Sequence, residues 1–339
     1  MKFVRMGSTG AQVSQLCLGC MRFGGMADWM LNEEASLPLV RRAVEAGINF
    51  FDTADVYSRG ESEEILGRAL KALAVPRDET VVATKVFNRM GRGPNRAGLA
   101  RKHILQSIDA SLTRLGLDYV DLYQIHRFDY ETPLEETIEA LDDVVKAGKA
   151  LYIGASSMFA YQFSKYLHRA DQLGRTRFSM MQNHYNLAYR EEEREMNPLC
   201  VEEGVGLIPW SPLAGGYLAG NREAGTVRGK SPWGADRYHR PSDQAVLEAL
   251  RGVAKARGET PAQVAIAWML AKPGVTAPII GATKVSHLED PIRAVEAPRL
   301  SAEEIAALEA PYEAQSIMGA IRRGEDLETR RAILTRTRD

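Results

Sequence analysis

The chain has 339 residues, of which 45% are hydrophobic and 26% are charged. These proportions are ordinary for a globular protein, and they exclude a disordered chain, a collagen and a small disulfide-stapled peptide. Lys and Arg total 43 against 44 Asp and Glu, so the net charge of −1 gives no reason to expect a nucleic acid partner. Three cysteines are too few for a disulfide framework and favour a reducing compartment.

The chain carries no stretch typical of a signal peptide or a membrane helix. Its first 14 residues lack the apolar core of a signal peptide. The longest apolar run, VAIAWMLA, stops at Lys272 and is too short to span a membrane. We therefore expect a cytoplasmic protein with no membrane partner; its oligomeric state does not follow from the sequence.

Eight short apolar runs along the chain predict strands. Their apolar content is nearly continuous, which is typical of parallel strands covered on both faces. The runs comprise residues 16–20, 48–51, 81–84, 119–125, 150–155, 178–182, 205–209 and 276–281.

Amphipathic patterns between these runs predict helices. One begins at Ser62 and ends at Leu73, and a second covers 101–115 with a single apolar face. A third ends near Gly148 and begins with Thr132 as the N-cap and Pro133 at the first helical position. This alternation predicts an α/β fold, a single (β/α)8 TIM barrel, with an open doubly wound sheet as the alternative.

Such a barrel needs about 250 residues, so roughly 90 remain for additions. Residues 1–14 are expected to form a hairpin before the first strand, and residues 211–242 a long loop after the seventh. We predict one domain over 1–339, with the barrel core at about 16–311, a tail at 312–339 and long loops at the C-terminal face.

Polar residues follow several of the predicted strands. Asp52, Lys85 and His126 each come after an apolar run, and Tyr57 lies in the loop five residues beyond Asp52. The carboxyl ends of barrel strands meet at one face, where active sites are built. Each residue alone has a structural explanation, as an ion pair, a hydrogen-bonding histidine or a packed ring, but their coincidence favours an active site.

These four residue types together suit proton delivery to a carbonyl oxygen. A tyrosine is a poor acid at neutral pH, and we expect the neighbouring Lys85 to lower the pKa of Tyr57. Asp52 would keep Lys85 charged, and His126 would donate to the same carbonyl oxygen. None of the four donates hydride, so a reduction needs a cofactor.

The segments that carry these residues resemble the aldo-keto reductase superfamily. FFDTADVYSRGESEEILGRAL, VVATK and DLYQIHR hold the four residues, and YIGASS, MQNHYN, IPWSPLAGG and PIIGATK follow in the family's order. The likeness runs from about Val4 to Tyr312 and is greatest to bacterial YajO-type members, which carry the name 1-deoxyxylulose-5-phosphate synthase. It implies reduction of an aldehyde or ketone to an alcohol with NADPH, with Asp52, Tyr57, Lys85 and His126 as the catalytic set and Tyr57 as the proton donor.

The resemblance also implies that NADPH binds in an extended pose across the barrel mouth. Ser156 and Gln182 would hold the nicotinamide carboxamide, and Trp210 would stack on its ring. The loop from Ser211 would close on the pyrophosphate, and the segment from Gly281 would receive the 2′-phosphate. The full cofactor set implied is Met21, Ser156, Ser157, Gln182, Trp210, Ser211, Leu213, Gly215, Gly281, Thr283, Lys284, His287 and Asp290.

Four positions depart from the family pattern. Ser157 stands where many members have Asn, and His287 stands where Gln or Arg is usual. Asp290-Pro291 replaces the usual Glu-Asn, so Pro291 offers no side-chain amide to the adenine.

The substrate pocket is expected to be apolar at its mouth. Trp29, Phe87 and Phe128 are the predicted substrate-binding residues and suit an aryl or alkyl aldehyde. The alternative is a phosphate or carboxylate group received by the basic residues of the 89–96 segment.

Two other patterns are given structural explanations. Cys17 and Cys20 lie three apart on a strand and point to opposite faces, so we predict no metal site. The charged run at 190–196 is expected to be a solvated helix face.

Two alternative functions remain open at this point. A lysine at a barrel strand end can be a Schiff-base nucleophile, so Lys85 would make the protein an aldolase, although Asp52 argues against this. The other is a cofactor-sensing binding module, since potassium-channel β-subunits also resemble aldo-keto reductases.

Overall fold

A computed structural model describes residues 1–220 and 237–323 of the chain. Eight parallel strands form one sheet in the order β10-β3-β4-β5-β6-β7-β8-β9. Parallel bridges between Leu207 and Val275 and between Trp210 and Ile279 join the flanks of the two outermost strands. The strands are β3 (Cys17–Gly19), β4 (Phe50–Asp52), β5 (Val81–Val86), β6 (Val120–Ile125), β7 (Ala150–Ser156), β8 (Phe178–Gln182), β9 (Gly206–Leu207) and β10 (Ile279–Ile280). The eight strand predictions and the (β/α)8 barrel are confirmed.

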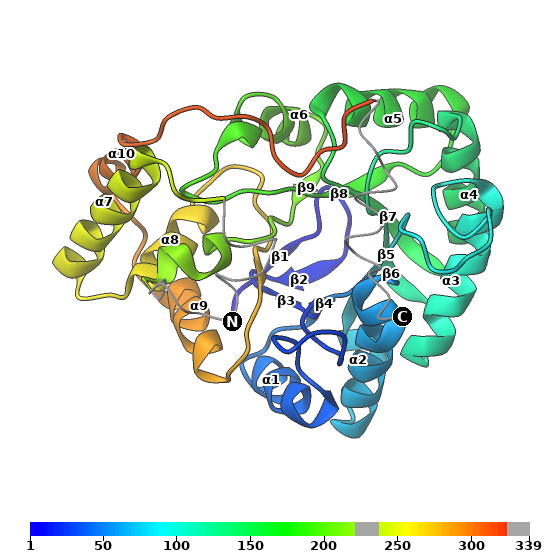
Figure 1. The fold of residues 1–339 in the computed structure, drawn as a ribbon, viewed down its shortest axis with the longest axis horizontal. Helices are drawn as coiled ribbons and strands as arrows, with labels where there is room; N and C mark the ends of the chain where they lie inside the picture. The colour runs from blue at the N-terminus through cyan, green and yellow to red at the C-terminus, as the bar shows by residue number, and fades with distance from the viewer. Residues whose placement is uncertain (221–236, 324–339) are drawn as a thin grey trace.

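Helices surround the strands on the outside (Figure 1). Those of the described residues are α1 (Glu33–Glu45), α2 (Glu61–Ala72), α3 (Arg101–Leu115), α4 (Leu134–Lys146), α5 (Ala160–Leu173), α6 (Met196–Glu202), α7 (Pro241–Arg257), α8 (Pro261–Leu270), α9 (Ser286–Glu296) and α10 (Ala302–Glu309). The predicted helix at 101–115 matches α3. None of these helices combines the length and apolarity that a membrane span requires.

Alternation along each strand divides the core into two parts. Cys17 and Phe50 face the barrel interior, in one cluster with Met180. The next residues, Leu18 and Phe51, belong to the cluster between strands and helices. This is the two-residue period of a strand covered on both faces. The same alternation separates Cys17 from Cys20, and no group of metal-ligating residues is found within 1–220 and 237–323.

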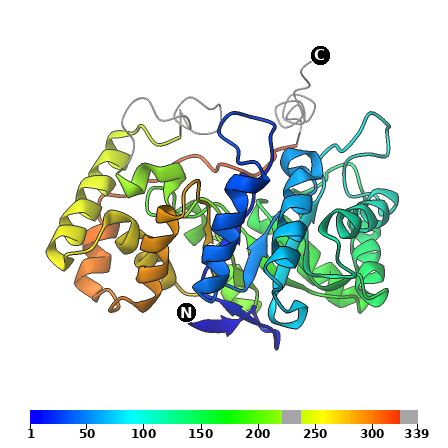
Figure 2. The same cartoon turned by 90° about the horizontal axis from the view of Figure 1, so that it is seen from below.

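The predicted N-terminal hairpin is confirmed. The strands β1 (Phe3–Arg5) and β2 (Gln12–Ser14) pair antiparallel. Met6 and Val13 from the hairpin join the interior cluster and so close that end of the barrel. The loop after β3 and the C-terminal segment lie at the opposite end (Figure 2).

One cap prediction was wrong. The N-cap residue of α4 is Pro133, and it has no side-chain cap. The hydroxyl of Thr132 donates instead to the Oδ2 of Asp129 at 2.9 Å. The Thr132 hydroxyl is turned toward this carboxylate three residues earlier, and its oxygen does not accept the backbone N–H hydrogen bond that an N-cap would accept.

The prediction of a solvated helix face at 190–196 was wrong for part of the run. Glu191 is only 6% exposed and accepts hydrogen bonds from the Tyr312 hydroxyl at 2.7 Å and the Gln315 backbone N–H at 2.9 Å. The C-terminal segment, here defined as residues 312–323, packs over Glu191, whereas Arg194 and Glu195 are exposed. This contact joins residues more than 100 positions apart, so no pattern in the sequence around Glu191 predicts it.

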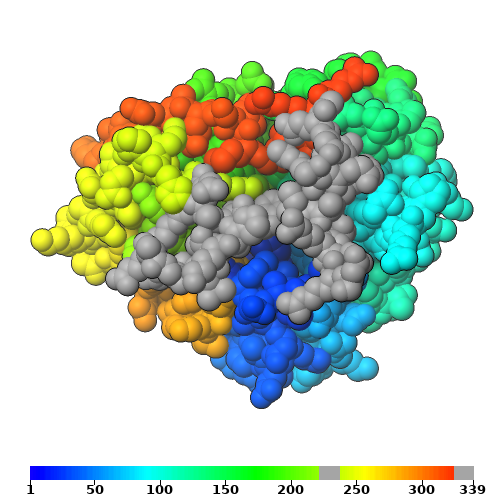
Figure 3. All heavy atoms as spheres, in the orientation of Figure 1, coloured from blue at the N-terminus to red at the C-terminus, as the bar shows by residue number. Residues whose placement is uncertain are grey.

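The predicted long loop at 211–242 and tail at 312–339 are described only in part. A short 3-10 helix, Ala214–Ala219, follows β9, and α7 begins at Pro241. The rest of these two predictions, at 221–236 and 324–339, lies outside the described residues. On the surface, the C-terminal segment and the residues after β3 lie on opposite sides of one face (Figure 3).

Candidate active site

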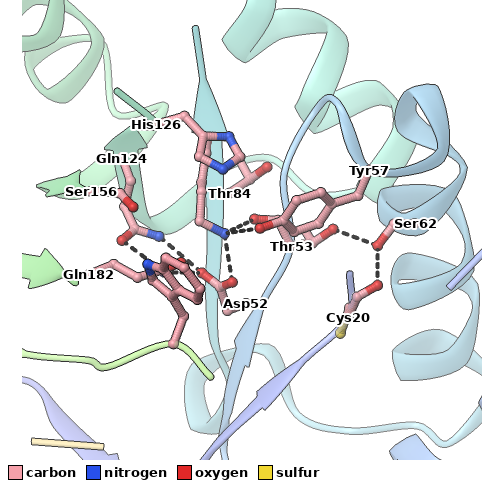
Figure 4. Close-up of polar contacts among 12 residues, drawn as sticks. Cys20, Asp52, Thr53, Tyr57, Ser62, Thr84, Gln124, His126, Ser156 and Gln182 are labelled. Carbon is pink, nitrogen blue, oxygen red and sulfur yellow. Dashed lines mark hydrogen bonds and ion pairs between the residues drawn. The ribbon is translucent and has the colours of Figure 1, made fainter. Parts of the chain in front are cut away.

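Strand register brings the predicted catalytic side chains together. Asp52 ends β4, Lys85 lies in β5, and His126 directly follows β6. Because the strands are parallel and neighbouring, their carboxyl ends share one edge. Tyr57 begins the short turn Tyr57–Gly60 and points back toward Asp52 from the loop (Figure 4).

A buried ion pair forms the centre of the site. The Nζ of Lys85 lies 2.6 Å from the Oδ2 of Asp52 and 2.8 Å from the carbonyl oxygen of Thr53. It also donates to the hydroxyl of Tyr57 at 3.3 Å. Both charged side chains are almost fully buried. The ammonium therefore has three oxygen partners, and one of them is the phenol.

The loop that carries Tyr57 is held in a strained conformation. Ser58 and Arg59 adopt left-handed backbone angles, with φ of 48° and 56°. Such residues persist only where the surroundings enforce them. Here the Ser58 hydroxyl donates to the Phe23 carbonyl at 3.0 Å, and the Ser62 hydroxyl donates to the Cys20 carbonyl at 2.7 Å. The loop is thus tied to the segment after β3.

The pKa of Lys85 is raised. Burial lowers the pKa of this ammonium, but the Asp52 carboxylate and the Tyr57 hydroxyl together outweigh burial. A nucleophilic lysine needs a lowered pKa. The geometry therefore opposes the Schiff-base alternative.

Lys85 lowers the pKa of Tyr57 as expected, but the pKa of this phenol still lies above its ordinary value. Burial raises the pKa of Tyr57, and the opposing effect of the Lys85 charge is smaller. The negative charge of Asp52 also raises the pKa of Tyr57. The phenol is consequently protonated at neutral pH, with an ammonium beside it that stabilises any phenolate formed.

His126 is a neutral imidazole in this site. Burial and the charges of Arg127 and Lys85 keep its pKa well below the ordinary value. Its Nδ1 lies 3.0 Å from the Nδ2 of Asn88, so the amide donates and the ring carries its proton on Nε2. The rings of His126 and Tyr57 meet edge to face at 5.7 Å. The His126 and Tyr57 side chains therefore lie next to each other and can contact the same substrate atom.

Two residues of this centre were missed in the sequence. Gln124 on β6 donates to the Oδ1 of Asp52 at 3.0 Å, and Asn88 orients His126. The signal for Gln124 was available, because it is an amide within the buried run YVDLYQI. Asn88 sits in a loop beyond β5, and no pattern singled it out.

The predicted nicotinamide-side residues lie beside this centre. Gln182 ends β8, and its amide nitrogen donates to the Oδ1 of Asp52 at 2.8 Å. The hydroxyls of Ser156 and Ser157 are 3.2 Å apart, and the indole N–H of Trp210 donates to the Ser157 hydroxyl at 2.9 Å. Ser157 therefore fixes the Trp210 ring.

An unpredicted histidine supports that ring from behind. His184 stacks on Trp210 with ring centroids 4.0 Å apart and an interplanar angle of 8°, and it stacks on Tyr189 at 4.3 Å. Burial keeps the pKa of His184 well below its ordinary value. The stack is a rigid wall, and His184 at its centre comes from the segment MQNHYN quoted above.

The segment after β9 bends sharply where the pyrophosphate loop was expected. Ser211 and Gly215 take left-handed angles, with φ of 59° and 69°. The Asn186 amide holds the Ser211 carbonyl at 3.0 Å. Ser211, Leu213 and Gly215 are each partly exposed. Their backbone is thus accessible to a ligand.

The predicted 2′-phosphate segment precedes α9. Gly281, Lys284 and His287 are exposed, and α9 has no side-chain cap. Thr283 contacts the His287 ring, at 3.3 Å from its hydroxyl. An uncapped helix N-terminus beside a lysine attracts anions, so this segment fits a phosphate. Asp290 lies about one turn further along α9, 3.8 Å from Arg293.

The remaining predicted residues differ in exposure. Met21 is 39% exposed, and Trp29 and Phe128 are partly exposed. Phe87 is 1% exposed and packs in the core. Of the three predicted substrate residues, only Trp29 and Phe128 keep surface available to a ligand.

Comparison with known proteins identifies the family. Residues 15–313 match the model of the Aldo/keto reductase family. The chain belongs to the aldo/keto reductase family. It is 43% identical to versiconal hemiacetal acetate reductase of Aspergillus parasiticus over 94% of this chain and 98% of the relative. It is also 41% identical to aldo-keto reductase AMT2 of Alternaria alternata, over 93% and 92%. A putative aryl-alcohol dehydrogenase, C977.14c of Schizosaccharomyces pombe, is 41% identical over 93% and 97%. The protein is therefore an oxidoreductase that acts on a small carbonyl substrate with a nicotinamide cofactor.

Proposed function

We propose that this aldo-keto reductase uses NADPH to reduce an aldehyde or ketone and that Tyr57 protonates the carbonyl oxygen. The observation that carries the proposal is the bridging position of Lys85, whose ammonium contacts both the Asp52 carboxylate and the Tyr57 hydroxyl. A phenol beside a fixed ammonium is an acid whose conjugate base is stabilised where it forms.

The proton moves from the Tyr57 hydroxyl to the carbonyl oxygen as negative charge develops there. Lys85 stabilises the resulting phenolate, and Asp52 keeps Lys85 in place. His126, neutral and protonated on Nε2, donates a second hydrogen bond to the same oxygen. The raised pKa of Tyr57 suits this direction, because the acid must arrive protonated.

The residues around the site fit NADPH. The cofactor supplies the hydride when bound. Ser156 and Gln182 would hold its carboxamide, and the rigid stack of Trp210 on His184 offers a flat face to the ring. The uncapped N-terminus of α9, with Lys284, supports binding of the 2′-phosphate and hence a preference over NADH.

The substrate proposed is an aryl or alkyl aldehyde. Trp29 and Phe128 offer partly exposed aromatic surface, and one relative carries the name aryl-alcohol dehydrogenase. The three relatives described above are fungal, and the closer likeness to bacterial YajO-type members stays a prediction. So do the cytoplasmic location, the cofactor-sensing alternative and the single domain over 1–339.

A Tyr57→Phe variant tests the mechanism. We expect NADPH binding, followed by fluorescence, to be unchanged while turnover of an aldehyde panel falls by about 10²–10⁴-fold, the size of general acid catalysis. Tyr161→Phe is the matched control, because Tyr161 is 52% exposed on α5. Undiminished turnover in Tyr57→Phe would refute the role. Parallel assays with NADH and with Lys284→Met test the cofactor preference.

A further inference from the structure

The carboxylate of Asp52 is held by more than its ion pair. Its Oδ2 faces Lys85, while its Oδ1 accepts from the side-chain amides of Gln124 at 3.0 Å and Gln182 at 2.8 Å. The Gln182 amide nitrogen also lies 3.3 Å from the Oε1 of Gln124. Both glutamines are almost fully buried. Asp52 is therefore held at both of its carboxylate oxygens.

Barrel packing is arranged around the Gln124 side chain. Gln124 pairs in register with Lys85 on one side and with Gly154 on the other. A Cβ added to Gly154 would lie 3.0 Å from the Cγ of Gln124, closer than side chains ordinarily pack, so the glycine leaves room for the Gln124 side chain. An amide buried among barrel side chains destabilises the fold unless it is hydrogen-bonded. Gln124 meets this need through Asp52 and Gln182.

The amide donors change how Asp52 acts on its neighbours. A carboxylate whose charge is shared with two N–H groups attracts the Lys85 ammonium less strongly than a bare one does. Asp52 raises the pKa of Tyr57 and Lys85 lowers it. Weakening the hold of Asp52 therefore leaves more of the ammonium charge available to the phenol, 3.3 Å away.

We propose that Gln124 is a positioning residue that orients Asp52, keeps Lys85 shared between Asp52 and Tyr57, and with Gln182 links this proton-delivery centre to the nicotinamide side. The inference rests on the proposed function, because it assigns Gln124 a part in the same proton transfer. Gln124 acts through Asp52 and touches no reacting atom.

Gln124→Met is the main test, since methionine keeps the length and loses both polar groups. We expect kcat to fall about tenfold or more, the size of one lost hydrogen bond to a charged group, with KM for NADPH within about twofold of the parent. We also expect the pKa of Tyr57 to rise further. Tyrosinate absorbance, taken as the difference from a Tyr57→Phe chain in each background, reads this titration without cofactor or turnover.

Gln162→Met is the matched control. Gln162 is a buried glutamine that hydrogen-bonds Tyr130 and the backbone of Phe159, away from Asp52. Its loss is expected to change stability while leaving the Tyr57 titration where it was. Gln124→Glu gives a second readout, because a glutamic acid donates to Asp52 only when protonated, so its kcat relative to the parent should recover as pH falls.

An unchanged kcat and an unchanged Tyr57 titration in Gln124→Met would overturn the inference. If that variant does not fold, a Gln124→Glu profile parallel to that of the parent overturns it instead. The two proposals fail separately: full activity of Tyr57→Phe removes the proposed mechanism, whereas the cofactor-free titration tests the effect of Gln124 on the Tyr57 phenol by itself.

Discussion

Replacing Lys85 by methionine removes the ammonium from the ion pair and leaves the charge of Asp52 buried. In the native site the Nζ of Lys85 lies 2.6 Å from the Oδ2 of Asp52, and side-chain exposures are 0% and 3%. Water cannot take the place of the lost partner without the site opening. The Asp52 carboxylate would keep only the two amide donors on its other oxygen.

The magnitude follows from this burial. Breaking one side of a buried ion pair costs about 3–5 kcal/mol of unfolding free energy. The retained donors from Gln124 and Gln182 place the estimate near the lower end, at about 3 kcal/mol. Asp52→Asn in the Lys85→Met background removes the stranded charge. We expect that double variant to recover about 2 kcal/mol of the loss.

Urea unfolding of the cofactor-free protein, followed by circular dichroism at pH 7, measures these differences. An exposed pair provides the control: Arg101 and Asp143 have side-chain exposures of 46% and 43%. Arg101→Met is therefore expected to cost less than about 1 kcal/mol.

A loss under about 1 kcal/mol for Lys85→Met, equal to that of the exposed control, would contradict the reasoning. So would a double variant less stable than Lys85→Met alone. Either result would mean that water or a rearranged neighbour satisfies Asp52, and that the buried pair does not hold the site together.

Two further predictions concern residues outside the ion pair. Burial and the charge of Glu63 raise the pKa of Asp55 well above its ordinary value. Asp55 therefore lowers the free energy of unfolding increasingly as pH rises, and has no such effect at acid pH, where Asp55 is protonated in both the folded and the unfolded chain. Asp55→Asn should therefore raise the free energy of unfolding in urea by about 1–3 kcal/mol at pH 7 and have no such effect near pH 4. An equal gain at both pH values would contradict this. A Cβ on Gly67 would lie 2.1 Å from the Leu115 carbonyl oxygen, whereas one on Gly252 in α7 meets nothing within 4 Å. Gly67→Ala should cost about 1–3 kcal/mol and Gly252→Ala should add up to about 1 kcal/mol in the same assay, and equal effects would be the contrary result.

The sequence was sufficient for most of the fold. Eight continuous apolar runs predicted eight strands, and the match of 101–115 to α3 reflects a single apolar face that has only one way to be buried. The errors were of another kind. Thr132 hydrogen-bonds the nearby Asp129 and does not cap α4, and Glu191 in the 190–196 run is covered by residues that follow it by more than 100 positions.

The part of the candidate site that lies at strand ends could be predicted from the sequence. Asp52, Lys85 and His126 could be found because each interrupts an apolar run at the same end of a parallel strand. Asn88 and His184 could not be found in this way, because Asn88 acts by orienting the His126 ring and His184 by stacking on the Trp210 ring. The pKa of Tyr57 also escaped the sequence, since burial depends on everything packed around the loop.

The sequence by itself determined the eight apolar runs and the polar residues that follow them, and from these it predicted a barrel, with an open sheet as the alternative. Periodicity is a local property, and each strand carries its own. Only the tertiary structure decided that Gln124 and Gln182 share one oxygen of Asp52 while Lys85 takes the other. Distances of a few ångströms between strands depend on register and twist, and no single strand encodes them.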